Sequence, residues 1–185
     1  VMASGMLGYL LPQKIGDTEQ KYIAELADEK LWTDCVASIE SSLMTFVRHG
    51  IDLKVKEYMF TLMLADPSSP YSVMNDGYCG DGGIPGYIFG SLVPSETTKT
   101  RIPVVLAHET NHNVRFQYIK WSNEISLAEY MICEGLAENF AVKLYGEENL
   151  GPWVSKTDQE MLNEYIKPLI QDALEVRGFD NITSY

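Results

Sequence analysis

Two histidines and a glutamate at close spacing are the residues of this chain that are best suited to chemistry. His108, Glu109 and His112 form a His-Glu-x-x-His pattern. On an α-helix, side chains four residues apart lie on the same face, so both imidazoles can point at one Zn²⁺ ion. Glu109 would lie beside that ion, where a carboxylate can take a proton from an activated water and later deliver it to a leaving group. The pattern predicts a hydrolytic metal site.

The flanks of this pattern argue against a chance match on a surface helix. Apart from Glu109, the residues next to both histidines are uncharged. Val105 and Leu106 precede the first histidine, and the apolar Val114 stands two places after the second. In these respects the segment resembles the longer signature of zinc metallopeptidases, which has the same preferences.

A catalytic zinc ion needs a third protein ligand, because such sites use three ligands and keep one position open for water. No third histidine follows closely downstream. An acidic residue on the following helix is the natural candidate, and Glu134 and Glu138 lie one turn apart there. Exchanging their roles would change the ligand set but leave the mechanism intact.

A resemblance separates the roles of these two glutamates. The sequence Cys133-Glu134-Gly135-Leu136-Ala137 resembles the Asn-Glu-Gly-Phe-Ala motif of the aminopeptidase branch of the gluzincins, whose third zinc ligand is a glutamate on a second helix. The resemblance implies that Glu134 binds zinc. Glu138 falls where the thermolysin branch has an aspartate that orients the first zinc histidine, and a carboxylate commonly does this.

The order of motifs is also similar to a bacterial family of predicted zinc-dependent proteases, which is catalogued as a domain of unknown function. The resemblance covers residues 33–151. It implies a zincin-like fold, and toward the C-terminus this chain departs from the Gly-Tyr-containing segment associated with the family.

The elements that must position these residues predict an α+β protein, mostly helical, with a small β-sheet before the active-site helix. Apolar runs predict strands at 58–64 and 87–93, and we expect the glycine-rich residues 77–86 to be a tight connection. The strand at 87–93 is well placed to bind a substrate as an added strand. Helical periodicity predicts one further helix, from Thr157 to Val176.

We expect a single domain over residues 1–185. It divides into N-terminal helices (1–57), the sheet and glycine-rich loop (58–99), a metal-binding helix pair (100–146) and a C-terminal helix (152–185). The metal helix is expected to begin between 100 and 103 and to end near Trp121.

Composition limits the partners. The net charge is −12, from 14 basic and 26 acidic residues, which lacks the basic footprint of nucleic-acid binding. No apolar run reaches the length of a membrane span. Three cysteines without paired spacing, and a start without signal-peptide features, favour a cytoplasmic location and buried thiols. His49 is expected to end a helix rather than to bind metal.

The sequence therefore predicts zinc-dependent hydrolysis of peptide bonds in a peptide or protein substrate, with Glu109 as the general base. The alternative is a zinc-binding module of low or no activity that holds a peptide without cutting it. A structural zinc site is weaker still, because such sites are closed by four protein ligands. An oxyanion donor is also needed, and the tyrosines leave its identity open: Tyr118, Tyr130, Tyr145, Tyr165 and Tyr185.

Overall fold

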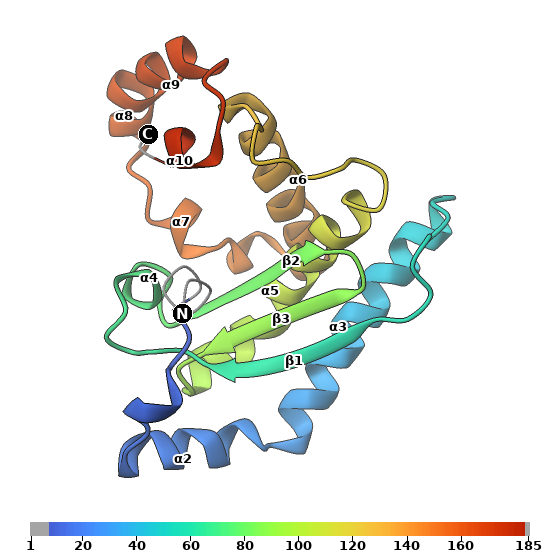
Figure 1. The fold of residues 1–185 in the computed structure, drawn as a ribbon, viewed down its shortest axis with the longest axis vertical. Helices are drawn as coiled ribbons and strands as arrows, with labels where there is room; N and C mark the ends of the chain where they lie inside the picture. The colour runs from blue at the N-terminus through green and yellow to red at the C-terminus, as the bar shows by residue number, and fades with distance from the viewer. Residues whose placement is uncertain (1–7, 184–185) are drawn as a thin grey trace.

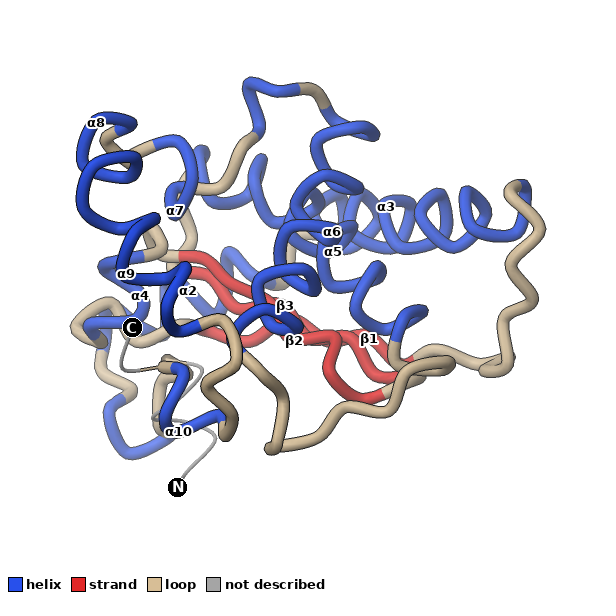
Figure 2. The backbone as a smooth tube through the Cα atoms, turned by 90° about the horizontal axis from the view of Figure 1, so that it is seen from above, coloured by secondary structure: helices blue, strands red, loops and turns tan. Residues whose placement is uncertain are grey.

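A three-stranded β-sheet carries the long helices of the chain on one side, as Figures 1 and 2 show. The computed structural model describes residues 8–183, and the expected α+β class, mostly helical with a small sheet, is confirmed. The elements are η1 (Pro12–Lys14), α2 (Asp17–Leu26), α3 (Glu29–Arg48), β1 (Met59–Leu64), α4 (Pro70–Met74), β2 (Tyr78–Ile84), β3 (Tyr87–Leu92), α5 (Glu96–Arg115), α6 (Leu127–Tyr145), η2 (Glu147–Asn149), α7 (Pro152–Ser155), α8 (Gln159–Met161), the π-helix η3 (Leu162–Ile166), α9 (Lys167–Ala173) and α10 (Phe179–Ile182).

The sheet has the order β1-β3-β2. β1 runs parallel to β3, and β2 runs antiparallel to β3 with a register shift between Asp81 and Ile84. The strands expected at 58–64 and 87–93 are confirmed as β1 and β3. The expectation that residues 77–86 form only a connection was wrong, because Tyr78–Ile84 is a strand.

The position of β2 also corrects the expected substrate strand. β3 is paired on both sides, so it has no edge to offer, and β2 takes the edge. Figure 1 shows β2 on the side of the sheet nearest α6 and α7, and β1 on the side nearest α2. Backbone hydrogen bonds need no side chains, so a glycine-rich segment can pair when the packing around it demands small residues.

Helix α5 lies at the centre of the packing, in contact with β2, β3, α3 and α6. It begins at Glu96, earlier than expected, because the Ser95 hydroxyl accepts the Thr98 N–H at 3.1 Å. It ends at Arg115, earlier than the expected Trp121. Pro103 therefore lies inside the helix, where its carbonyl accepts the Ser38 hydroxyl of α3 at 2.5 Å. This bond ties α5 to α3.

The ends of α6 follow the sequence closely. Ser126 and Glu129 form a capping box, in which Ser126 N–H donates to Glu129 and Glu129 N–H donates to Ser126 Oγ. The helix stops at Gly146, whose φ is +94°. The C-terminal helix is not continuous as expected: Asp158 caps it instead of Thr157, and a π turn precedes α9, where Pro168 cannot donate a backbone hydrogen bond.

The main core joins α3, the sheet and α5, and a separate cluster joins α6 to the C-terminal segment. The C-cap position of His49, with Nδ1 2.8 Å from the Thr45 carbonyl oxygen, confirms its expected place at a helix end. Across residues 8–183, none of the helices combines the length and apolarity needed to cross a membrane. The members of the two clusters are Leu26, Leu31, Cys35, Ile39, Leu62, Tyr78, Ile88, Leu92, Ile102, Val105 and Leu106, and Leu127, Ala173 and Ile182.

Candidate metal centre

The two histidines of α5 turn their Nε2 atoms toward one another. His108 and His112 lie one helical turn apart, their Nε2 atoms are 3.0 Å apart, and both side chains are buried. Both lie in the C-terminal half of α5, where most side chains are buried. The expected pairing of the two imidazoles is present.

Glu134 reaches this pair from α6. Its two carboxylate oxygens lie 3.4 Å from His108 Nε2 and 3.5 Å from His112 Nε2. The Glu134 side chain is 42% exposed, so it stands at the open side of the site. Among the described residues, these three side chains form a group that could hold a metal ion.

The spacing of the three donors fits zinc. Bonds of about 2.1 Å in a tetrahedral arrangement separate neighbouring donors by about 3.4 Å, and the observed separations are 3.0, 3.4 and 3.5 Å. Two imidazoles and one carboxylate are also a donor set that zinc prefers. The group has three members, as in catalytic sites that keep a fourth position open.

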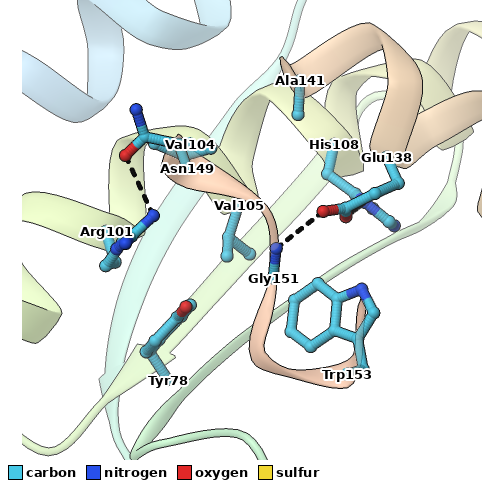
Figure 3. Close-up of a pocket in the computed structure, with 10 residues that line it drawn as sticks. All are labelled: Tyr78, Arg101, Val104, Val105, His108, Glu138, Ala141, Asn149, Gly151 and Trp153. Carbon is cyan, nitrogen blue, oxygen red and sulfur yellow. Dashed lines mark hydrogen bonds and ion pairs between the residues drawn. The ribbon is translucent and has the colours of Figure 1, made fainter. Parts of the chain in front are cut away.

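Glu138 holds the far side of His108. Its Oε2 is 3.1 Å from His108 Nδ1, and its Oε1 accepts the Gly151 N–H at 2.7 Å. Figure 3 shows the carboxylate between the imidazole and the Gly151 backbone, with the Trp153 indole beside it. Glu138 thus faces the ring nitrogen that points away from Glu134, and the C-terminal segment holds it there.

Cys133 holds the far side of His112. Its sulfur is 3.3 Å from His112 Nδ1, and the residue is 2% exposed. Sequence reasoning predicted buried thiols and gave Cys133 no contact with the site. The cysteines are buried and none forms a disulfide, but Cys133 contacts a metal-site histidine. The adjacent position of Cys133 and Glu134 was a signal that sequence reasoning did not use.

The cluster strongly perturbs its own proton equilibria. Burial lowers the pKa of both histidines, but Glu134 and Glu138 beside His108, and Cys133 and Glu134 beside His112, outweigh it. The pKa values of His108 and His112 rise to about 9 and about 11. Burial raises the pKa of Glu134, yet hydrogen bonds with both histidines hold it at about 2.

Glu109 occupies a pocket made for it by β2. A Cβ at Gly80 would lie 2.4 Å from Glu109 Cγ, so only glycine leaves room for this side chain. Burial raises the pKa of Glu109, and His108 and His112 oppose the rise. The Glu109 carboxyl group therefore lies next to the three donors. Its buried surroundings favour the protonated form more than they would for a glutamate exposed to water.

Two hollows meet at the site and together form a cleft. One, of about 340 Å³, includes Trp153 and Val154, and the other, of about 380 Å³, includes Phe116 and Trp121. Both are lined by Tyr71, Gly80, Glu109, Tyr130 and Glu134. His108 lines the first hollow, His112 lines the second and Glu134 lines both, so the three donors lie where the hollows meet.

The comparison with protein families decides which family this is. Residues 31–185 match the family described as "Predicted Zn-dependent protease (DUF2268)". The chain belongs to this family. The match to DUF2268 extends through the C-terminal helices, further than the range 33–151 expected from the motifs.

A curated relative is also similar to this chain. The chain is 37% identical to the "Uncharacterized protein YjfC" of Bacillus subtilis (strain 168). The similarity covers all of this chain and 61% of the relative's length. No solved structure matches.

In this member of DUF2268, the structure shows which of the candidate tyrosines line the two hollows and which lie elsewhere. Tyr130 lines both hollows. Tyr118 donates a hydrogen bond to the Asp52 carbonyl oxygen, and Tyr145 packs against a small apolar cluster between α5 and α6. Tyr185 lies outside the described residues. Tyr71 of α4, which sequence reasoning missed, lines both hollows opposite α6. Tyr71 lies far from His108 and His112 in the sequence, so no local spacing or motif connects it with them.

Proposed function

We propose that this protein hydrolyses peptide bonds with the help of zinc, and that His108, His112 and Glu134 hold the ion. The observation that carries the proposal is the convergence of three zinc-type donors at 3.0–3.5 Å on a cleft that also contains the buried Glu109 carboxyl. The family description supports the coarser statement that this is a predicted zinc-dependent protease. A bound zinc would make a water acidic and polarise a carbonyl group.

In this proposal Glu109 takes the proton from the attacking water and passes it to the leaving amine. Its raised pKa, caused by burial, brings the carboxyl closer to the range in which it can both accept and donate. Glu138 and Cys133 keep the imidazoles of His108 and His112 turned so that Nε2 faces the ion. The phenols of Tyr71 and Tyr130 are the candidates that can donate to the developing oxyanion.

Among residues 8–183, β3 is the only strand that pairs with β2, and the open outer edge of β2 supports a peptide as the substrate. Gly80, Asp81 and Gly83 of this strand line the hollow next to Glu109. An extended peptide paired with an edge strand gains backbone hydrogen bonds that do not depend on its sequence. Such pairing would carry a scissile bond past Glu109 and Glu134.

The test is a pair of variants measured for zinc content and peptide hydrolysis. Glu109→Gln should keep one zinc per chain and lose at least about a hundredfold in hydrolysis rate. Glu134→Ala should lose zinc, and Glu164→Gln, which alters an exposed glutamate away from the cleft, should match the wild type. Undiminished hydrolysis in Glu109→Gln would refute the mechanism. Zinc and peptide binding without any hydrolysis by the wild type would instead favour a non-catalytic peptide-binding module.

A further inference from the structure

A group of four packed aromatic rings lines one half of the cleft. We call this hollow of about 380 Å³ the aromatic pocket, and the four rings are Phe116, Trp121, Tyr130 and Phe179, with Tyr71 as a further aromatic lining residue. The four rings come from the end of α5, the loop after it, α6 and α10. All four are half-buried, so part of each ring remains open to the pocket. The volume is within the range of roughly 300–1,000 Å³ that ligand sites occupy.

The rings hold one another in place. Trp121 packs edge-to-face with Phe116, Tyr130 and Phe179, at centroid distances of 5.3, 6.3 and 6.1 Å. Tyr130 and Phe179 are also edge-to-face, at 6.0 Å. This arrangement fixes a wall of aromatic groups, whose ring faces carry partial negative charge and attract cations.

The charged residues of the aromatic pocket are all acidic apart from His112. Asp81, Glu109 and Glu134 line it, and no lysine or arginine of residues 8–183 does so. A divalent ion at the metal centre would compensate Glu109 and Glu134 and leave the charge of Asp81 unmatched. Asp81 lies where the register of β2 shifts, and its Oδ1 accepts the Gly83 N–H at 2.8 Å. That bond orients the carboxylate.

We propose that the aromatic pocket binds an arginine or lysine side chain of the peptide substrate, beside the scissile bond. The cationic head would contact the Asp81 carboxylate while its stem lies against the aromatic wall. A neutral apolar side chain fits less well, because it would cover the Asp81 carboxylate without giving it a partner. This inference rests on the proposed peptidase function and adds its substrate class.

Binding of two matched peptides tests the inference without hydrolysis. The peptides are identical except that one carries arginine and the other citrulline, which has the same shape without the charge. Calorimetry with zinc-loaded Glu109→Gln protein should show the arginine peptide binding about tenfold more tightly. The difference should shrink as salt is added, since part of it is an interaction between charges near the surface.

Variants of the aromatic pocket test which of its residues cause the preference for arginine over citrulline. Asp81→Asn and Trp121→Leu should each reduce the preference for arginine over citrulline, whereas Asp180→Asn, an exposed acid on α10, should retain it. Equal binding of the two peptides, or tighter binding of a phenylalanine peptide than of the arginine peptide, would overturn the inference. A preference that survives Asp81→Asn and Trp121→Leu unchanged would also overturn it, by placing the cation elsewhere.

Hydrolysis of the same peptides by the wild-type protein separates the two proposals. Mass spectrometry of the products should show cleavage of a bond next to the arginine. Cleavage without any preference between arginine and citrulline would refute the basic substrate class and leave the peptidase function standing. Selective binding of the arginine peptide with no cleavage would refute the peptidase function and leave the binding inference standing.

Discussion

At the scale of single residues, Nδ1 of each histidine in the candidate metal site faces a different partner. Nδ1 of His108 faces the Glu138 carboxylate, and Nδ1 of His112 faces the Cys133 sulfur. A hydrogen on Nδ1 that is held by such a partner leaves the Nε2 lone pair directed at the ion. A thiol is a weaker acceptor than a carboxylate, so the two histidines are held with unequal strength.

Removing the sulfur should therefore weaken the site. Cys133→Ala leaves His112 Nδ1 without its partner, and we expect zinc affinity to fall by about tenfold. Cys133→Ser keeps an acceptor and should recover part of the loss. Competition with a chromogenic chelator measures both, and Cys35→Ala, a buried thiol of the main core, is the control. An alanine variant with the affinity of the wild type would show that Cys133 does not position His112.

Zinc binding should release protons. The pKa values of His108 and His112 are raised to about 9 and about 11 in the metal-free site. At pH 7 at least one of the two imidazoles is therefore in its cationic form, and the ion must displace the additional proton. Zinc affinity should then rise with pH from 6 to 8. Calorimetry in buffers of different ionisation enthalpy counts the protons, and binding that is independent of both buffer and pH would contradict this expectation.

At the scale of elements, the contact between β2 and α5 depends on glycines. A Cβ at Gly82 would lie 2.1 Å from the Glu109 carbonyl oxygen, which belongs to the helix backbone and cannot move aside alone. Gly80 makes room for the Glu109 side chain in the same way. The strand therefore approaches the metal helix more closely than other residues would allow.

Alanine at these positions should separate the strand from the helix. We expect Gly82→Ala to lower the free energy of unfolding by roughly 2 kcal/mol or more, as overpacking does. Gly135→Ala is the matched control, because nothing lies within 4 Å of its added Cβ and alanine favours the helix by about 1 kcal/mol. Urea denaturation of the metal-free proteins measures both. Equal stability of the two variants would contradict the close contact.

At the scale of the whole molecule, the C-terminal segment fixes how α6 lies against α5. Leu127 N–H and Ala128 N–H, in the first turn of α6, donate to the carbonyl oxygens of Val176 and Leu174. Near the middle of the helix, Glu138 accepts the Gly151 N–H. Residues that follow α6 in the chain thus hold it in the orientation that brings Glu134 to the histidines.

Zinc should stabilise the folded protein, because the ion would be bound by residues of both α5 and α6. An ion bound only by the folded protein stabilises it by about 2.7 kcal/mol at one hundred times its dissociation constant, which is a rise of roughly 5–10 °C in melting temperature for a chain of this size. Glu134→Ala should abolish the rise, and His49→Ala should retain it, since His49 lies at the end of α3 away from the donors. A zinc-induced rise that persists in Glu134→Ala would place the third ligand elsewhere.

The spacing of His108 and His112, the capping box at Ser126 and the strands at 58–64 and 87–93 were all readable in the sequence. Each of them depends on neighbours a few residues away, which is why periodicity and capping rules could find them. Glu134 and Glu138 became candidates because a catalytic zinc ion needs a third ligand. Only a motif resemblance separated their roles, because a loop lies between the two helices and no spacing rule crosses it.

Other features depend on contacts between distant segments, and only the tertiary structure decided them. In the sequence, the glycines of 77–86 resemble a flexible connection, and only the packing of α5 against them explains why small residues are needed. Tyr71, Cys133 and the rings of the aromatic pocket are brought to the site by helices that are distant in sequence and adjacent in the fold. Burial and hydrogen bonding across elements have no signature in one sequence. The sequence by itself thus determined the chemistry of the ligands, and the fold decided what surrounds them, because surroundings are a property of packing.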